Sequence, residues 1–469
     1  MTYDFVIIGS GPAGSTLSWK LSNLGFKIAM IDRAIYEEKR LINDFFCPYI
    51  HKSPKFYTPV YSDQLGGNSA LWHSKIYLIS EKEYDHTKWG FDYNELKFYS
   101  TDLAKKLKIE DVKLTEILTK DENYYHTSIR SNLKNLFKYF KLDINNNIEI
   151  YKGYSPTKLN FQNKKVESVE ILNTKNQKKT LFVKKSLIFC AGGLGNPHLL
   201  MNLIPIKNEI VGKNLSDHAH VNLCRVNSNK LENYKNILKP NIKNNLTIFN
   251  LDKNEELAQI FEEENFFAGV QLDYKIDPMR KIRRLFLKIN NIYIRKILSI
   301  FGFLILKLNG LVAKFGIFFN KYYKYSFEFF FSQNQDPRNF LKLDQYKVDE
   351  FGLKKININW DLTKKDKDKI NSIIQKSVGF NGKLFQSSED ISFSKNFYSH
   401  GLAGLHPSCT TKIGINKSQG VVDSNLKLYD YENIFVSGSS VFPQNGFTNP
   451  TWTIMTLSSR LASFLKDKN

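Results

Sequence analysis

The chain has 469 residues, of which 42% are hydrophobic and 24% charged, and its 67 basic and 46 acidic residues give a net charge of +21. This apolar content excludes wholesale disorder, because disordered chains lack the apolar surface that offsets chain entropy. The length allows two domains of ordinary size, or one large core with a substantial insertion. Four widely spaced cysteines without a CxxC pair argue against a disulfide scaffold or a cysteine-based zinc site, and we predict no metal.

The positive charge admits two interpretations. A basic surface is typical of proteins that bind nucleic acid or anionic lipid. Here, however, the basic residues are mostly lysines spread along the chain, often beside Asn and Ile, as in residues 145–150 and 355–359. This pattern favours solvated surface, and we expect no nucleic-acid partner.

The N-terminus predicts a βαβ unit. The apolar run Phe5–Ile8 is too short for a secretory signal and favours a buried parallel strand. A glycine-rich turn, a helical pattern over Ser15–Leu24 and a second strand at Lys27–Ile31 follow it, and the unit ends at Asp32. A strand, helix and strand in this order form the frame of a dinucleotide-binding motif.

The turn of this unit has the pattern GxGxxG and predicts dinucleotide binding. Gly9 permits the tight turn, Gly11 lets the backbone approach a pyrophosphate, and Gly14 lets the helix pack closely on the strand. The helix N-terminus offers free N–H groups to phosphates. A carboxylate at the end of the second strand suits the ribose of FAD or NAD and argues against NADP. The predicted cofactor-binding residues here are Gly9, Gly11, Pro12, Ala13, Gly14 and Asp32.

Two further glycine-rich turns indicate ligand contact. Adjacent glycines within residues 64–72 predict close approach of the backbone to a ligand or a neighbouring strand. An apolar strand at Ser186–Cys190 runs into a second such turn and a helix starting near His198, and turns of this kind lie at the ligand-binding edge of a parallel sheet. The cofactor-binding residues predicted in these turns are Gly66, Gly67, Asn68, Trp72, Ala191 and Gly192.

The remaining pattern is less regular. Residues 92–140 predict amphipathic helix, and residues 148–189 predict a meander with strands at Ile148–Tyr151, Val166–Leu172 and Thr180–Val183. Residues 219–400 mix strand-like alternation with long polar stretches and predict a second domain on a mainly antiparallel sheet.

One segment, at about 280–325, is both basic and apolar. Basic residues precede a run, Ile297–Leu306, that carries no charge, and Lys307, Lys314 and Lys321 would share one helix face. Interspersed charges and glycines argue against a membrane-spanning helix. Two interpretations stay open: a helical insertion packed on its own domain, and an in-plane segment on an anionic membrane surface.

The last 70 residues carry most of the candidate chemistry. His406 precedes a strand at Asn433–Val436, whose Gly/Ser turn contains Gly438 and Ser439. A terminal helix, Trp452–Lys466, opens after Asn449, Pro450 and Thr451, with proline expected in its first turn and Asn449 as its N-cap. Taken alone, His406 is more simply interpreted as a satisfied, half-buried imidazole.

Together these motifs resemble the glucose–methanol–choline (GMC) family of FAD-dependent oxidoreductases. The resemblance covers most of the chain in the right order, although residues 225–325 match poorly. The matching stretches are GSGPAGS at 9–15 with Asp32, LGGNSALW at 65–72, FCAGGLGNPHLL at 189–200, GKNLSDH at 212–218, FSQNQDPRNFL at 331–341, HPSCTTKIG at 406–414 and NPT at 449–451.

The resemblance implies an α/β fold in two domains. A Rossmann-like FAD-binding domain, discontinuous in sequence, would comprise residues 1–80, 148–220 and 401–469. An α+β substrate domain on a mainly antiparallel sheet would comprise 81–147 and 221–400, with the basic and apolar insertion at about 280–325.

The activity implied by the resemblance is oxidation of a CH–OH group in an alcohol, a sugar or a sterol-like molecule. His406 would act as the base and Asn449 would hold the substrate oxygen, while hydride passes to flavin N5. An imidazole near its reference pKa of about 6.5 suits the proton transfer, and an amide can donate to the developing oxyanion. The resemblance also adds Gly438, Ser439, Pro450 and Thr451 to the FAD-binding residues.

The chain departs from the family pattern at a few positions. It has Cys409 where glycine is common and Ile413 where methionine is common. Relatives that bind FAD covalently use a histidine at the position of Leu71, so we expect non-covalent FAD, although His73 lies nearby. The alternatives are a non-redox flavoprotein of lyase or decarboxylase type and a membrane-associated module that retains the fold. We expect a cytoplasmic location, with or without membrane association; the substrate and the electron acceptor stay open.

Overall fold

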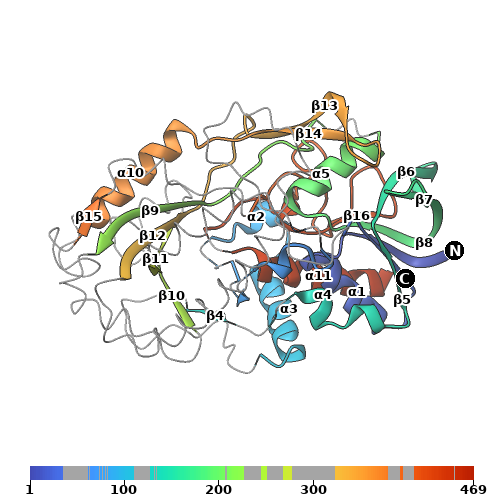
Figure 1. Ribbon diagram of the computed structural model, residues 1–469, viewed down its shortest axis with the longest axis horizontal. Helices are drawn as coiled ribbons and strands as arrows, with labels where there is room; N and C mark the ends of the chain where they lie inside the picture. The colour runs from blue at the N-terminus through green and yellow to red at the C-terminus, as the bar shows by residue number, and fades with distance from the viewer. Residues whose placement is uncertain are drawn as a thin grey trace, which may run out of the picture.

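The computed structural model describes most of the chain. The described residues are 1–34, 62, 64–72, 74–76, 78–79, 81, 83–109, 127–130, 133, 135–205, 209–226, 245–250, 268–276, 323–378, 391–393, 406–447 and 449–468. Within them lie two seven-stranded sheets and a two-stranded hairpin, with both termini beside the first sheet (Figure 1).

The first sheet has a parallel core built from apolar strands. Its order runs from β5 (Ile148–Lys152) to β2 (Ile28–Asp32), β1 (Thr2–Ile8) and β8 (Lys178–Phe189), with β16 (Ile434–Val436) paired to β8. Each of these neighbours pairs in parallel. Burial on both faces explains the continuous apolar runs of β1, β2 and β16. The predicted βαβ unit is present, and its helix is α1 (Pro12–Ser22).

The prediction for residues 148–189 was partly wrong. The strands expected at 180–183 and 186–190 are one strand, β8, which continues through Lys184 and Lys185 with a shift in its pairing register with β1. Antiparallel strands β6 (Tyr154–Gln162) and β7 (Lys165–Asn173) extend the sheet beyond β8. The segment at 148–151 belongs instead to the parallel edge, as β5.

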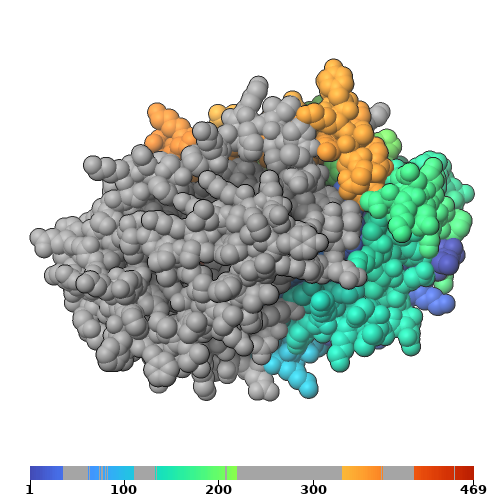
Figure 2. Space-filling model, in the orientation of Figure 1, coloured from blue at the N-terminus to red at the C-terminus, as the bar shows by residue number. Residues whose placement is uncertain are grey.

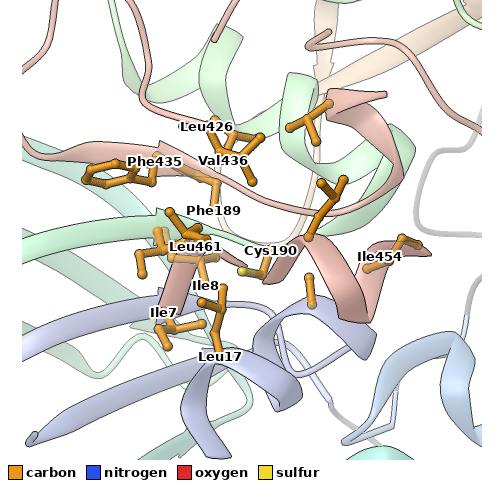
Figure 3. Packing of buried hydrophobic residues seen from close by; sticks show 14 of the residues in the cluster. Ile7, Ile8, Leu17, Phe189, Cys190, Leu426, Phe435, Val436, Ile454 and Leu461 are labelled. Atoms are coloured by element: carbon orange, nitrogen blue, oxygen red, sulfur yellow. The ribbon is translucent and has the colours of Figure 1, made fainter. Parts of the chain in front are cut away.

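Helices cover this sheet. Helix α11 (Thr451–Lys468) packs against α1 and α3 (Tyr93–Lys106), and α5 (Gly192–Leu203) follows β8. Figure 3 shows side chains of strands and helices meeting in one apolar core, among them Ile7, Ile8, Leu17, Phe189, Phe435, Val436 and Leu461. The short helices are α2 (His86–Trp89), α4 (Leu136–Tyr139) and the 3-10 turns η1 (Gly67–Ala70), η2 (Leu142–Ile144) and η7 (Ser439–Val441).

The second sheet is antiparallel at each pairing, as predicted for residues 219–400. Residues 92–140 are only partly helical, because Thr127–Arg130 form strand β4 and pair with two strands of this sheet. Sheet pairing there overrides local helical pattern. The sheet order is β15 (Ile391–Phe393), β9 (Ala219–Val226), β12 (Tyr323–Phe331), β11 (Ala268–Ile276), β10 (Asn245–Asn250), β4 and β3 (Lys75–Ile76).

A hairpin follows β12 of the second sheet and packs against α5, the helix after β8. Strands β13 (Phe340–Val348) and β14 (Lys354–Asn359) pair antiparallel, and the hairpin lies at the surface in the space-filling view, in orange (Figure 2). A separate buried cluster fixes it on α5 and on the chain before β9. Its members are Leu194, Leu215, Leu341, Ile356, Ile358 and Trp360. Helix α10 (Lys364–Val378) follows the hairpin.

The predicted basic and apolar insertion lies almost wholly outside the described residues, and its last residues, 323–325, begin β12. In the described part of the chain, every helix is too short or too polar to cross a lipid bilayer.

Candidate active site

The first glycine turn lies between β1 and α1. A Cβ at Gly9, whose φ is +102°, would lie 2.6 Å from the Cys190 carbonyl oxygen, and a Cβ at Gly14 would lie 1.8 Å from the Gly9 oxygen. A Cβ at Gly11, in contrast, would meet no protein atom within 4 Å. The turn is therefore closed toward β8 and open at Gly11, where Pro12 and Ala13 begin the helix.

Asp32 ends β2 directly beside this turn. Its Oδ2 accepts a hydrogen bond from the Ser10 backbone N–H at 2.6 Å, and its Oδ1 accepts one from the Ala34 N–H at 2.8 Å. Burial raises the pKa of Asp32, and these hydrogen bonds oppose that shift. The carboxylate is thus held at the end of β2, where the sequence predicts it.

The next residue, Arg33, was not singled out from the sequence. Its Nη2 donates to Asp349 Oδ2 at 2.6 Å, and its guanidinium lies 4.8 Å from the ring centre of Phe351. Both partners lie in the turn between β13 and β14. The hairpin therefore reaches the position beside Asp32, a contact that no local pattern reveals.

The second glycine turn lies against the first. The Gly66 N–H donates to Ser10 Oγ at 2.8 Å, and a Cβ on Gly67 would lie 3.1 Å from the Gly11 Cα. Asn68 Oδ1 accepts from the Ser62 N–H at 2.9 Å. The indole N–H of Trp72 is buried, without a hydrogen-bond partner among the described residues. It is a donor that a bound ligand could satisfy.

The third turn joins the strand-ends of β8 and β16. Asn196 Oδ1 accepts from the Ala191 N–H at 2.7 Å, while its Nδ2 donates to the Ser437 oxygen at 3.0 Å. A Cβ on Gly438 would lie 3.6 Å from the Gly192 Cα. The predicted FAD residues of these turns therefore gather at the carboxyl ends of parallel strands, which is where dinucleotides bind in such sheets.

The segment that carries His406 runs along the turn after Gly438. The N–H groups of Cys409 and Thr411 donate to the oxygens of Ser439 and Ser440 at 3.1 and 2.8 Å. Ser439 Oγ in turn donates to the Pro407 oxygen at 2.7 Å. His406 is half-buried and lies one residue before this paired segment.

A second histidine contacts His406. The Nδ1 atom of His406 lies 2.8 Å from Nε2 of His218, and the two ring centres are 4.5 Å apart. The His406 backbone N–H also donates to Asp217 Oδ2 at 3.3 Å. These three side chains place potential metal-ligand atoms within 4.8 Å of one another. Neither Asp217 nor His218 was assigned a role from the sequence, although both belong to the stretch 212–218.

The comparison with protein families decides the assignment. Two models described as GMC oxidoreductase match residues 129–220 and 335–458. The chain belongs to the GMC oxidoreductase family. Its cofactor is accordingly FAD, and the open face at Gly11 and the buried Trp72 N–H fit such a ligand. The described residues that would hold it are those of the three glycine turns together with Asp32.

Solved structures show the same fold. A formate oxidase from Aspergillus oryzae is 15% identical, with a TM-score of 0.62 over 100% of this chain and 98% of that one. An FAD-dependent oxidoreductase from Chaetomium thermophilum is also 15% identical, with a TM-score of 0.61 over 99% of both chains. Pyridoxine 4-oxidase from Mesorbium loti is 13% identical, with a TM-score of 0.57 over 98% of this chain and 99% of its own.

A curated relative matches only locally. Geranylgeranyl diphosphate reductase from Rhodobacter capsulatus is 42% identical over 55 residues, which is 10% of this chain and 14% of that protein. The match therefore covers only a small part of each of the two chains, and it does not indicate a substrate for this protein.

The start of the terminal helix in this GMC oxidoreductase differs slightly from prediction. Helix α11 begins at Thr451, and the Pro450 oxygen accepts from the Ile454 N–H at 2.9 Å. Pro450 therefore precedes the first turn, because its carbonyl already opens the helical hydrogen-bond series. Asn449 is half-buried just before it. Pro450 thus occupies the N-cap position, and the N-cap role predicted for Asn449 was wrong because the helix begins one residue further on. The convergence of Asn449 with His406 on one substrate oxygen stays a prediction.

The two cysteines described near the site, Cys190 and Cys409, are both buried. Burial raises the pKa of the Cys190 thiol and of the Cys409 thiol. Because the thiolate is the reactive form, this shift argues against a nucleophilic role for either residue. Cys409, which replaces the glycine common in the family, has a φ of +69° and therefore lies in the left-handed region that favours glycine.

Proposed function

We propose that this FAD-dependent oxidoreductase oxidises a CH–OH group of a small molecule, such as an alcohol, a sugar or a sterol-like compound. The observation that carries the proposal is the place of His406. It is a half-buried imidazole on a segment hydrogen-bonded along the Gly438–Val441 turn, at the edge of the sheet that holds the predicted FAD residues.

The chemistry assigns separate tasks to two side chains. His406 takes the hydroxyl proton on Nε2, while its Nδ1 lies 2.8 Å from His218 Nε2. Asn449 donates to the substrate oxygen as negative charge develops there. Loss of the proton makes loss of hydride from the same carbon easier, which is the purpose of a general base here. Bound FAD would supply the hydride acceptor, flavin N5.

We further propose that FAD is held without a covalent bond. Leu71 occupies the position at which covalent relatives have histidine, and it lies directly after the 3-10 turn η1. His73 lies outside the described residues.

The formate oxidase and the pyridoxine oxidase share this fold but differ in the compound that their names contain, so the fold alone selects no substrate. The cytoplasmic location stays a prediction.

The test is anaerobic flavin bleaching. Purified protein should be yellow and release FAD on denaturation, and a panel of alcohols, sugars and sterols should contain a compound that bleaches the flavin. A colourless preparation that yields no FAD would refute the cofactor and the function together. A yellow protein that no compound of the panel bleaches would refute CH–OH oxidation and favour non-redox chemistry.

A further inference from the structure

We propose that His218 is a positioning residue for His406: it accepts a hydrogen bond from His406 Nδ1 and so fixes the tautomer whose Nε2 can take the substrate proton. This inference rests on the proposed function, in which His406 is the base. It assigns a task to a side chain that the catalytic pair of His406 and Asn449 does not include.

The backbone register brings the two rings together. Ser216 and Ser408 exchange backbone hydrogen bonds, with N–H to oxygen distances of 3.2 and 2.9 Å, in an antiparallel bridge. In an antiparallel pair, residues two positions further on lie opposite each other and on the same face. Moving forward from Ser216 and backward from Ser408 leads to His218 and His406. The contact is therefore set by main-chain pairing.

The required tautomer follows from the geometry. A base at Nε2 needs a lone pair on that atom, so the single proton of neutral His406 must lie on Nδ1. Nδ1 lies 2.8 Å from His218 Nε2. The Nδ1–H group then donates to a lone pair on His218, whose own proton lies on Nδ1. After proton transfer, the His406 imidazolium keeps the same partner, and a charged donor makes that bond stronger.

His218 is itself held in place. It is 1% exposed, and its ring meets the Phe330 ring edge-on at a centroid distance of 6.3 Å. The neighbouring Asp217 N–H donates to Gln333 Oε1 at 3.0 Å, and the same oxygen accepts from Trp360 Nε1 at 2.9 Å. The Phe330 ring of β12, together with the buried Gln333 amide and the Trp360 indole that follow this strand, therefore fixes the position of the acceptor.

The charged group beside the pair is Asp217. Asp217, His218 and His406 each bring one potential ligand atom within 4.8 Å of the others. Asp217 Oδ2 accepts the His406 backbone N–H at 3.3 Å. A carboxylate at this place stabilises the imidazolium that forms during the reaction, in the same direction as the His218 contact.

The kinetic test compares three variants of the FAD-loaded protein. In His218→Leu, the rate of anaerobic flavin reduction at its pH plateau should fall about tenfold or more, because orientation and tautomer are lost. The acid limb of its pH–rate profile should move to lower pH, because protonated His406 has lost an acceptor. His218→Gln, which keeps an acceptor, should recover most of the rate.

His198→Leu is the matched control. His198 is a buried histidine that donates to the Lys354 oxygen at 2.8 Å, away from His406. The control should lose stability and keep the wild-type pH profile. A His218→Leu variant with wild-type rate and pH profile would overturn the proposal, and so would one mole of bound zinc per mole of purified protein, because zinc would occupy these nitrogens.

Nitrogen NMR of ¹⁵N-histidine-labelled protein supplies a readout besides activity. The His406 signals, identified by their loss in His406→Gln, should show the proton on Nδ1 in the wild type and a mixture of tautomers in His218→Leu. A wild-type proton on Nε2 would overturn the inference. If no compound bleaches the wild-type flavin, the proposed function fails, and this spectrum still decides whether His218 sets the tautomer of His406.

Discussion

Two regions of this GMC oxidoreductase meet at one sheet edge and depend on opposite features of their residues. The glycine turns from Gly9 to Gly14 and from Gly66 to Gly67 work by lacking side chains, because backbone atoms, the Asn135 side chain or open space lie where Cβ atoms would be. The His218–His406 pair works only through its side chains. The first region should therefore fail through added volume and the second through altered chemistry, and substitutions can separate cofactor binding from catalysis.

The largest expected effect comes from His406→Ala. It should lower the rate of anaerobic flavin reduction by about 10²–10⁴-fold, the usual contribution of general-base catalysis. FAD content should stay at the wild-type level, because the glycine turns are untouched. Stopped-flow absorbance measures the rate, and flavin released on denaturation measures the content. Equal loss of FAD and of rate would show that the two regions are not separable.

His198, a buried histidine outside the His218–His406 pair, should make the stability of the protein depend on pH. Burial, followed by the charge of Arg33, lowers the pKa of His198 to about 4, against about 6.5 when unfolded. Between these values the unfolded chain binds a proton that the folded chain does not. The contribution of neutral His198 to the free energy of unfolding is thus full above about pH 6.5. It is lost as the pH falls toward 4, by up to about 1.4 kcal/mol per pH unit.

His198→Gln should remove this dependence, since glutamine does not titrate and can still donate to the Lys354 oxygen. Thermal unfolding midpoints between pH 7 and pH 4.5 should fall less steeply in the variant than in the wild type. Parallel slopes for the two proteins would contradict the assignment.

Gly11→Ala should affect cofactor binding alone. Its Cβ meets no protein atom within 4 Å, so apoprotein stability should hardly change, while FAD affinity should fall about tenfold or more because the methyl group occupies the face open to the ligand. Fluorescence titration with FAD measures this affinity. Gly14→Ala is the contrasting variant, since its Cβ would overlap the Gly9 oxygen and should lower apoprotein stability instead. Unchanged FAD affinity in Gly11→Ala would show that FAD does not bind against Gly11.

The smallest effect is expected at Cys409, between the two regions. Its φ of +69° costs a residue with a Cβ about 1–2 kcal/mol relative to glycine. Cys409→Ala keeps that strain and Cys409→Gly removes it, so the glycine variant should have the higher unfolding midpoint in urea. The opposite order would show that burial of the Cβ outweighs the strain.

The sequence predicted the βαβ unit of the first region, because its signals are local. Continuous apolar strands, the GxGxxG turn and Asp32 lie within one βαβ unit, so each residue constrains its neighbours. Local pattern misled where tertiary pairing decided the outcome: Thr127–Arg130 are strand in a segment predicted helical, and the lysines at 184–185 lie inside one long strand.

The second region could be predicted only in part. His406 was identified through a motif, but its contact with His218 joins residues 188 positions apart. That contact depends on the antiparallel bridge between Ser216 and Ser408, which no local periodicity encodes. A motif can identify the residues of such a site. Whether two of their rings face each other depends on the pairing register of distant segments, which only the fold defines.

One measurement tests the central claim most directly: anaerobic reaction of the FAD-loaded wild-type protein with the alcohols, sugars and sterols of the panel, followed by flavin absorbance and product analysis. The account predicts that at least one compound bleaches the flavin and yields one aldehyde or ketone per flavin reduced. A flavin that every compound leaves oxidised, or one that is bleached without a carbonyl product, would contradict it.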